Sequence, residues 1–136
     1  MSTIFAKIIS GEIPAYKVAE SSDFLAFLDI RPLAKGHTLV IPKKEVDYFF
    51  DMNDADLAAI TVFAKKVAHA IREVVPCKKI GTTVIGLEVP HAHIHLIPIN
   101  AVGDINFSRE PLQLSSDDMA ALAAKISATF LQNFPQ

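Results

Sequence analysis

Two long segments of the chain carry apolar residues at alternating steps of three and four positions, the spacing of one buried helical face. The first segment covers residues 54–75 and stops before Pro76, which cannot continue a helix. The second follows Ser115, whose hydroxyl is suited to cap a helix and which has Asp118 three positions later. We therefore predict a long central helix and a C-terminal helix. Their apolar faces comprise Leu57, Ile60, Ala64, Val67, Ile71 and Val74 in the first and Met119, Leu122, Ile126 and Phe130 in the second.

Shorter apolar stretches separated by turn-forming residues predict extended strands. These stretches lie at residues 16–20, 24–30, 37–42, 80–85 and 91–99. A brief helix is expected after Ser2 or Thr3, ending at Gly11, because Pro14 prevents it from resuming. The predicted fold class is α+β: an antiparallel sheet of about five strands with a short N-terminal helix, a long central helix and a C-terminal helix.

The length of 136 residues and an apolar content of about half predict one domain spanning residues 1–136. Residues 105–136 form a C-terminal extension, and its helix could complete the core, cover the active site or join a dimer interface. The net charge is −2 and the lysine pairs are scattered, so we expect no long nucleic acid as a partner. Because no apolar run approaches the roughly 18 residues needed to cross a bilayer, we expect a cytoplasmic protein with no membrane partner.

Three of the five histidines, His91, His93 and His95, stand at alternate positions. On one strand their side chains would share a face, about 6 to 7 Å apart, and could converge on one small anion. They could also be partly exposed residues without a chemical task. A zinc site is a further alternative, but three ligands in a line match tetrahedral corners poorly. The remaining interpretation is covalent catalysis at phosphorus, in which one imidazole attacks and a neighbour assists the leaving group. Spacing alone does not assign the roles.

The run His91-Ala92-His93-Ile94-His95-Leu96-Ile97 resembles the motif of the histidine triad (HIT) family. Residues 4–9, 12–15, 27–30 and 36–43 also resemble family segments in their order and spacing. This resemblance implies a HIT-like homodimer that binds a purine nucleotide or nucleoside monophosphate. It further implies that His93 forms a transient nucleotidyl intermediate which water resolves. His95 would contact the phosphate and assist the leaving group, while His91 and His37 would support the triad.

The resemblance also implies a nucleoside site. The carboxylate of Asp29 would accept hydrogen bonds from the ribose hydroxyls, and Glu88 would lie near the phosphate. Five apolar residues would form the wall around the base, although at least two of them are expected to be ordinary core. These are Ile4, Phe5, Ile8, Phe27 and Leu28.

Three departures from the family pattern affect this expectation. Ile85 and Leu87 stand where many relatives carry an asparagine and a glutamine near the phosphate. Glu88 would repel a phosphate unless it faces a histidine or solvent. Thr3 and the residue three positions later, an alanine, stand where zinc-binding members carry cysteines, so we expect no metal and no other cofactor.

The leading functional hypothesis is a nucleotide phosphate hydrolase or nucleotidyl transferase. Its substrate would be a purine nucleoside phosphoramidate or a similar nucleotide ester, cleaved through a covalent nucleotidyl-histidine. Two alternatives remain open. One is hydrolysis of dinucleoside polyphosphates by the same chemistry. The other is a nucleotide-binding dimer module with little catalytic activity, which the apolar loop before His91 favours.

Overall fold

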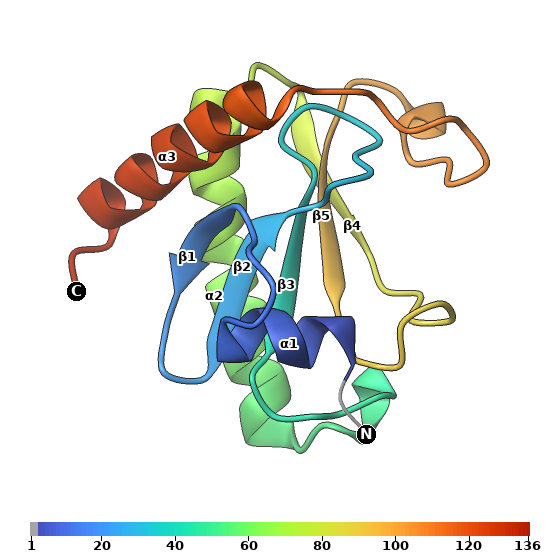
Figure 1. The fold of residues 1–136 in the computed structure, drawn as a ribbon, viewed down its shortest axis with the longest axis vertical. Coiled ribbons are helices and arrows are strands. Elements are labelled where there is room, and N and C mark those ends of the chain that lie inside the picture. Colours follow the sequence, from blue (N-terminus) through green and yellow to red (C-terminus); the bar gives the residue numbers. More distant parts are fainter. Residues whose placement is uncertain (1–2) are drawn as a thin grey trace.

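A single antiparallel sheet organises the computed structural model, which describes residues 3–136. Its five strands follow the order β1-β2-β3-β5-β4, and every neighbouring pair is antiparallel (Figure 1). The strands are β1 (Lys17–Glu20), β2 (Phe24–Leu28), β3 (Thr38–Pro42), β4 (Lys79–Thr83) and β5 (Ile94–Ile99). The helices are α1 (Ile4–Ser10), α2 (Asp54–Val74) and α3 (Ser116–Asn133), with short 3₁₀ turns η1 (Phe49–Asp51) and η2 (Val102–Asp104). The predicted α+β class is confirmed.

The ends of the helices lie close to where the sequence predicts them. The Thr3 hydroxyl caps α1 by accepting a hydrogen bond from the backbone N–H of Ala6 at 3.0 Å. Ser2, the other candidate cap, lies outside the described residues. Ser115 caps α3 in the same way, accepting from the N–H of Asp118 at 3.1 Å. Caps of this kind stabilise a helix by about 1 kcal/mol, because they satisfy backbone N–H groups that have no partner within the helix.

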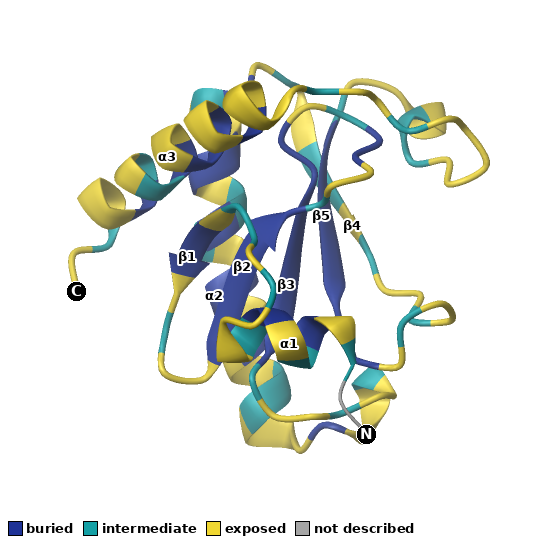
Figure 2. Cartoon of the chain, viewed as in Figure 1, coloured by how far each residue is buried: buried dark blue, intermediate teal, exposed yellow. Residues whose placement is uncertain are grey.

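The two faces of the sheet are covered by different helices. In Figures 1 and 2, α2 lies behind the sheet and α1 lies in front of it, while α3 runs across the upper left of the view. The buried residues of α2 and α3 belong to one core. Alternation along β2 divides its side chains between the two sides: Leu28 belongs to the larger core with α2 and α3, whereas Phe27 packs with α1. The buried residues Ile126 and Phe130 show that the C-terminal helix completes the larger core. Within residues 3–136, no helix is long and apolar enough to span a membrane.

The strand predicted at residues 91–99 is wrong at its beginning. Strand β5 begins at Ile94, so His91 and His93 lie in the segment that precedes it. Two observations explain this. Strand β3 ends at Pro42, which has no N–H to continue the ladder, and the N–H of Ala92 donates instead to the Val46 carbonyl at 2.6 Å. The histidine segment is therefore shaped by loop hydrogen bonds as well as by the pleat of the sheet.

Two other predicted strands are shorter than expected. Strand β4 runs over Lys79–Thr83 and leaves Ile85 in the loop before the histidines. Strand β2 ends at Leu28, so that Asp29 begins the connection to β3. Both corrections place candidate site residues in connections, where their side chains are free of the inward and outward alternation of a strand.

Candidate active site

Four histidines gather on the α1 side of the sheet. His91 and His93 precede β5, His95 lies within it, and His37 comes immediately before β3. All four side chains are buried. The ring of Phe5 on α1 packs edge-on against His91 and His93, with centroids 5.9 and 5.0 Å away. The structure therefore brings together all four histidines that the sequence singles out.

His91 is held at both ring nitrogens. Its Nε2–H donates to the Pro42 carbonyl at 2.8 Å, and because a carbonyl only accepts, the proton of the neutral ring is on Nε2. Its Nδ1 then accepts from the Thr3 hydroxyl at 3.2 Å. With both nitrogens engaged in hydrogen bonds, neither nitrogen of His91 offers a free lone pair. A hydrogen bond thus joins the opening helix to the triad at a position where zinc-binding relatives are expected to have a cysteine.

His93 presents an unprotonated nitrogen. Its Nδ1–H donates to the His91 carbonyl at 2.7 Å, which fixes the proton of the neutral ring on Nδ1. The lone pair is therefore on Nε2. The same carbonyl is placed to stabilise the positive charge that the ring acquires when Nε2 forms a bond to an electrophile. This is the arrangement that a nucleophilic histidine requires.

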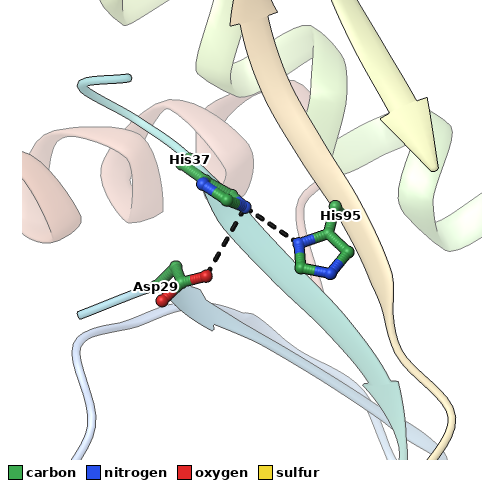
Figure 3. Close-up of side chains that lie close together, drawn as sticks. All are labelled: Asp29, His37 and His95. Carbon is green, nitrogen blue, oxygen red and sulfur yellow. Dashed lines mark hydrogen bonds and ion pairs between the residues drawn. The ribbon is translucent and has the colours of Figure 1, made fainter. Parts of the chain in front are cut away.

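A chain of hydrogen bonds gives His95 the opposite tautomer. The backbone N–H of Leu33 donates to Nδ1 of His37 at 3.0 Å, so the proton of His37 is on Nε2. That proton is donated to Nδ1 of His95 at 2.9 Å (Figure 3). The proton of His95 is therefore on its Nε2. The rings of His93 and His95 have centroids 5.0 Å apart, so a ring with a free lone pair lies next to a ring with a free N–H donor.

Gly36 makes this chain possible. Its φ of 93° lies in the left-handed region that favours glycine, and a Cβ there would be 3.0 Å from Cγ2 of Val75. The turn closes with a hydrogen bond from the N–H of His37 to the Ala34 carbonyl at 3.0 Å. It thereby folds His37 back so that its own Nδ1 meets the N–H of Leu33.

Asp29 adds a carboxylate beside the histidine chain. Its Oδ1 accepts from the backbone N–H of Arg31 at 2.8 Å, and its Oδ2 lies 3.5 Å from Nε2 of His37 (Figure 3). The first contact fixes the orientation of the carboxylate. Because Asp29 is only partly buried, part of the group remains open to a ligand.

The donor atoms of Asp29, His37 and His95 all lie within 4.8 Å of one another, a spacing that a metal ion could use. A metal ligand must offer a lone pair. The N–H of Leu33 occupies the lone pair of His37 at Nδ1, and the remaining nitrogen carries the proton donated to His95. These hydrogen bonds favour a proton-donating chain over a metal centre.

Burial keeps two of these histidines neutral. Burial is the main cause that lowers the pKa of His95 to about 3, and positive charge on His37 and His93 contributes to the same shift. Burial also lowers the pKa of His37, while the negative charge of Asp29 opposes that shift. At neutral pH His95 is therefore a neutral N–H donor.

The low pKa of His95 predicts a loss of stability in mild acid. The unfolded chain takes up a proton at this histidine near pH 6.5, whereas the folded chain does so only near pH 3, so the free energy of unfolding falls as the pH drops through this window. For one such group the loss from pH 6.5 to pH 5 is about 2 kcal/mol. Urea unfolding of the wild type and of His95→Gln at both pH values checks this, and the variant should lose about 2 kcal/mol less. His69→Ala, which removes an exposed histidine of α2, is the control and should keep the wild-type difference.

The residues predicted to form the wall around the base separate into different environments. Phe5, Ile8 and Phe27 are buried between α1 and the sheet, and the ring of Phe5 lies next to the rings of His91 and His93. Ile4 is 47% exposed at the start of α1. Leu28 faces the larger core on the other side of the sheet, so the structure does not bring it to the histidines.

The loop before His91 is open to solvent. Leu87 is 89% exposed, and Ile85 and Glu88 are also exposed. Sequence reasoning missed a different residue, Phe107, whose ring lies 4.9 Å from that of His95. Phe107 stands in an irregular segment without periodicity, so no local pattern predicts its position.

Comparisons with known proteins identify the family of this chain. The family profile of the HIT domain matches residues 10–102. An adenosine 5'-monophosphoramidase of Schizosaccharomyces pombe is 37% identical over 130 residues, covering 94% of this chain and 98% of the relative. A crystal structure of a HIT-like protein from Bartonella henselae has a TM-score of 0.81 and 32% identity, covering 94% of this chain and 96% of that one. A zinc-bound histidine triad family protein from Mycobacterium smegmatis has a TM-score of 0.81 and 29% identity, covering 98% and 96%. The chain belongs to the HIT family.

Proposed function

We propose that this protein cleaves a purine nucleoside phosphoramidate or a similar nucleotide ester by way of a nucleotidyl-histidine intermediate. The observation that carries the proposal is that the neighbouring rings of His93 and His95 have opposite tautomers, with a lone pair on Nε2 of His93 and an N–H on Nε2 of His95. The relationship to an adenosine 5'-monophosphoramidase supports the substrate class.

In the first step, Nε2 of His93 attacks the α-phosphorus and forms a P–N bond while the bond to the leaving group breaks. The His91 carbonyl, 2.7 Å from Nδ1, stabilises the cationic ring that results. His95 donates its Nε2–H as a hydrogen bond to the departing atom, and a proton from solvent completes the leaving group. This assignment agrees with the low pKa of His95, which makes it a neutral donor.

In the second step, water attacks the phosphorus and breaks the P–N bond to His93. The products are a nucleoside monophosphate and the regenerated neutral side chain of His93, and the proton lost by the water returns to solvent. If an alcohol or another acceptor takes the place of water, the same intermediate gives nucleotidyl transfer. His37 keeps His95 in the required tautomer through both steps.

We propose that the ribose hydroxyls donate hydrogen bonds to the carboxylate of Asp29. This carboxylate is partly exposed and is oriented by the N–H of Arg31. The base would lie against the apolar surface of α1, where the exposed Ile4 offers contact area with little discrimination between bases.

A direct assay tests the proposal. Purified protein is incubated separately with adenosine 5'-phosphoramidate and with a dinucleoside polyphosphate, and release of AMP is measured by chromatography. We expect AMP from the phosphoramidate and the same rate from His69→Ala, whose altered residue is exposed on α2. AMP released mainly from the polyphosphate would favour the second substrate class. Binding without product would favour a nucleotide-binding module, the alternative suggested by the exposed apolar Ile85 and Leu87.

We also propose that two copies associate through the edge of the sheet at β4. This strand has β5 on one side and no strand on the other among residues 3–136, and the exposed Val84 and Ile85 follow it. Such an open edge with apolar neighbours is a surface that a second copy could pair with. Light scattering of the purified protein should then give twice the mass of one chain.

A further inference from the structure

Residues 105–112, which we call the strap, cross the histidine-bearing face of the sheet. At one end Ile105 packs on β4, where a Cβ on Gly81 would lie 2.7 Å from Cδ1 of Ile105. Gly81 pairs with Ile97, two residues beyond His95 and therefore on the same face. At the other end, the N–H of Leu112 donates to the Pro32 carbonyl at 2.8 Å. The strap is thus fixed to β4 and to the connection between β2 and β3.

Hydrogen bonds also hold the strap to the turn that precedes it. The carboxylate of Asp104 accepts from the N–H groups of Asn100 and Ala101 at 2.7 and 2.9 Å. The guanidinium of Arg109 then donates to the Asp104 carbonyl at 2.9 Å, and Asn106 Oδ1 accepts from the N–H of Ser108 at 3.0 Å. These bonds hold the tip of the strap in one conformation, although most of its residues are exposed.

Phe107 lies at this tip and packs against the histidine chain. Its ring meets His95 edge-on with centroids 4.9 Å apart, and His37 with centroids 6.2 Å apart. Yet 43% of Phe107 remains exposed. An aromatic side chain buried for core stability would cover most of its surface. Phe107 instead presents apolar surface to solvent next to His95.

The proposed chemistry indicates which part of the substrate would contact the exposed surface of Phe107. In an in-line displacement the leaving group departs on the side of the phosphorus opposite Nε2 of His93. The departing atom also accepts the hydrogen bond of His95. The ring of His95 packs against the rings of both His93 and Phe107. A leaving group that extends past this hydrogen bond on the Phe107 side would meet the exposed part of that ring.

We infer that Phe107 is a specificity-determining residue that contacts the leaving group. The favoured substrates would be nucleoside phosphoramidates or esters whose leaving group carries an aromatic or bulky apolar moiety. This inference rests on the proposed function, because it assumes that His93 attacks the phosphorus. It adds a contact to the leaving group beyond the hydrogen bond that His95 donates.

The test compares two substrates that differ only in the leaving group: adenosine 5'-phosphoramidate and its N-benzyl derivative. In Phe107→Ala we expect kcat/KM for the benzyl compound to fall about five- to tenfold more than kcat/KM for the unsubstituted compound, the size of one lost aromatic contact. Phe107→Leu should recover part of the difference. Val102→Ala is the matched control, since Val102 is 99% exposed in the same connection. It should leave kcat/KM unchanged for both substrates.

Two results would overturn the inference. Equal losses for both substrates would show that Phe107 acts only through His95, and no loss for either would show that it contacts nothing in the reaction.

If the wild type turns over neither compound, the proposed function fails and calorimetry decides the inference separately. Phe107→Ala should then weaken binding of the benzyl compound about fivefold more than binding of the unsubstituted compound, and equal changes would reject the contact.

Discussion

Replacing His93 with alanine should reduce kcat on adenosine 5'-phosphoramidate by at least about 10⁴-fold, because it removes the nucleophile and not merely a contact. The dissociation constant of AMP should change by less than about threefold, since Asp29 and the apolar surface of α1 remain. Steady-state kinetics and calorimetry measure the two quantities. Retention of turnover within tenfold of the wild type would contradict the assignment of His93.

A trapping experiment distinguishes the nucleophile from a residue that only orients the substrate. Wild-type protein mixed rapidly with substrate and analysed at neutral pH should carry a mass increase of one adenylyl group, and His93→Ala should carry none. His91→Ala is an informative companion, because His91 has both nitrogens engaged with Pro42 and Thr3. It should slow turnover through misplacement of the segment and still form the adduct.

Replacing His37 with alanine should reduce kcat by about 10² to 10³-fold, although His37 lies beyond the reacting pair. Without the donor from His37, Nδ1 of His95 loses its partner, and His95 can adopt the tautomer that lacks a proton on Nε2. The variant should also unfold more easily, by about 1 to 3 kcal/mol, because the buried N–H of Leu33 loses its acceptor. Kinetics and urea unfolding measure the two effects.

The control for this variant separates hydrogen bonding from packing. His37→Gln places an amide N–H where it can donate to Nδ1 of His95, so we expect it to recover a substantial part of the lost kcat. Its stability need not recover to the same extent, because the contact with Leu33 changes. If the alanine and glutamine variants are equally slow, the chain from Leu33 to His95 does not set the tautomer.

The sequence alone predicts the features of this protein that depend on neighbouring residues. The apolar spacing from Leu57 to Val74 and the caps at Thr3 and Ser115 define helices that the structure confirms. The alternation of His91, His93 and His95 points to the candidate site, because three imidazoles at such spacing are chemically distinctive. The α+β class follows from the order of these elements along the chain.

Strand ends are harder to predict from the sequence, because they depend on the neighbouring strand. The residues around positions 91–93 do not indicate that the neighbouring strand β3 ends at Pro42. They also do not indicate that the N–H of Ala92 donates to the Val46 carbonyl. The face of the sheet taken by Leu28 depends in the same way on where β2 pairs and ends. The packing of α3 is decided by which apolar surface the other elements leave uncovered.

The chemistry of the site is decided by tertiary structure. His37 and His95 are 58 residues apart in the sequence, and His91 and Pro42 are 49 apart, yet these contacts determine which nitrogen of each ring carries a proton. Phe107 reaches the same rings from an irregular segment. The sequence determined which side chains are present and which local elements carry them. Only the fold decided their tautomers, their burial and their neighbours, because a hydrogen bond or a loss of solvent depends on atoms that come from distant parts of the chain.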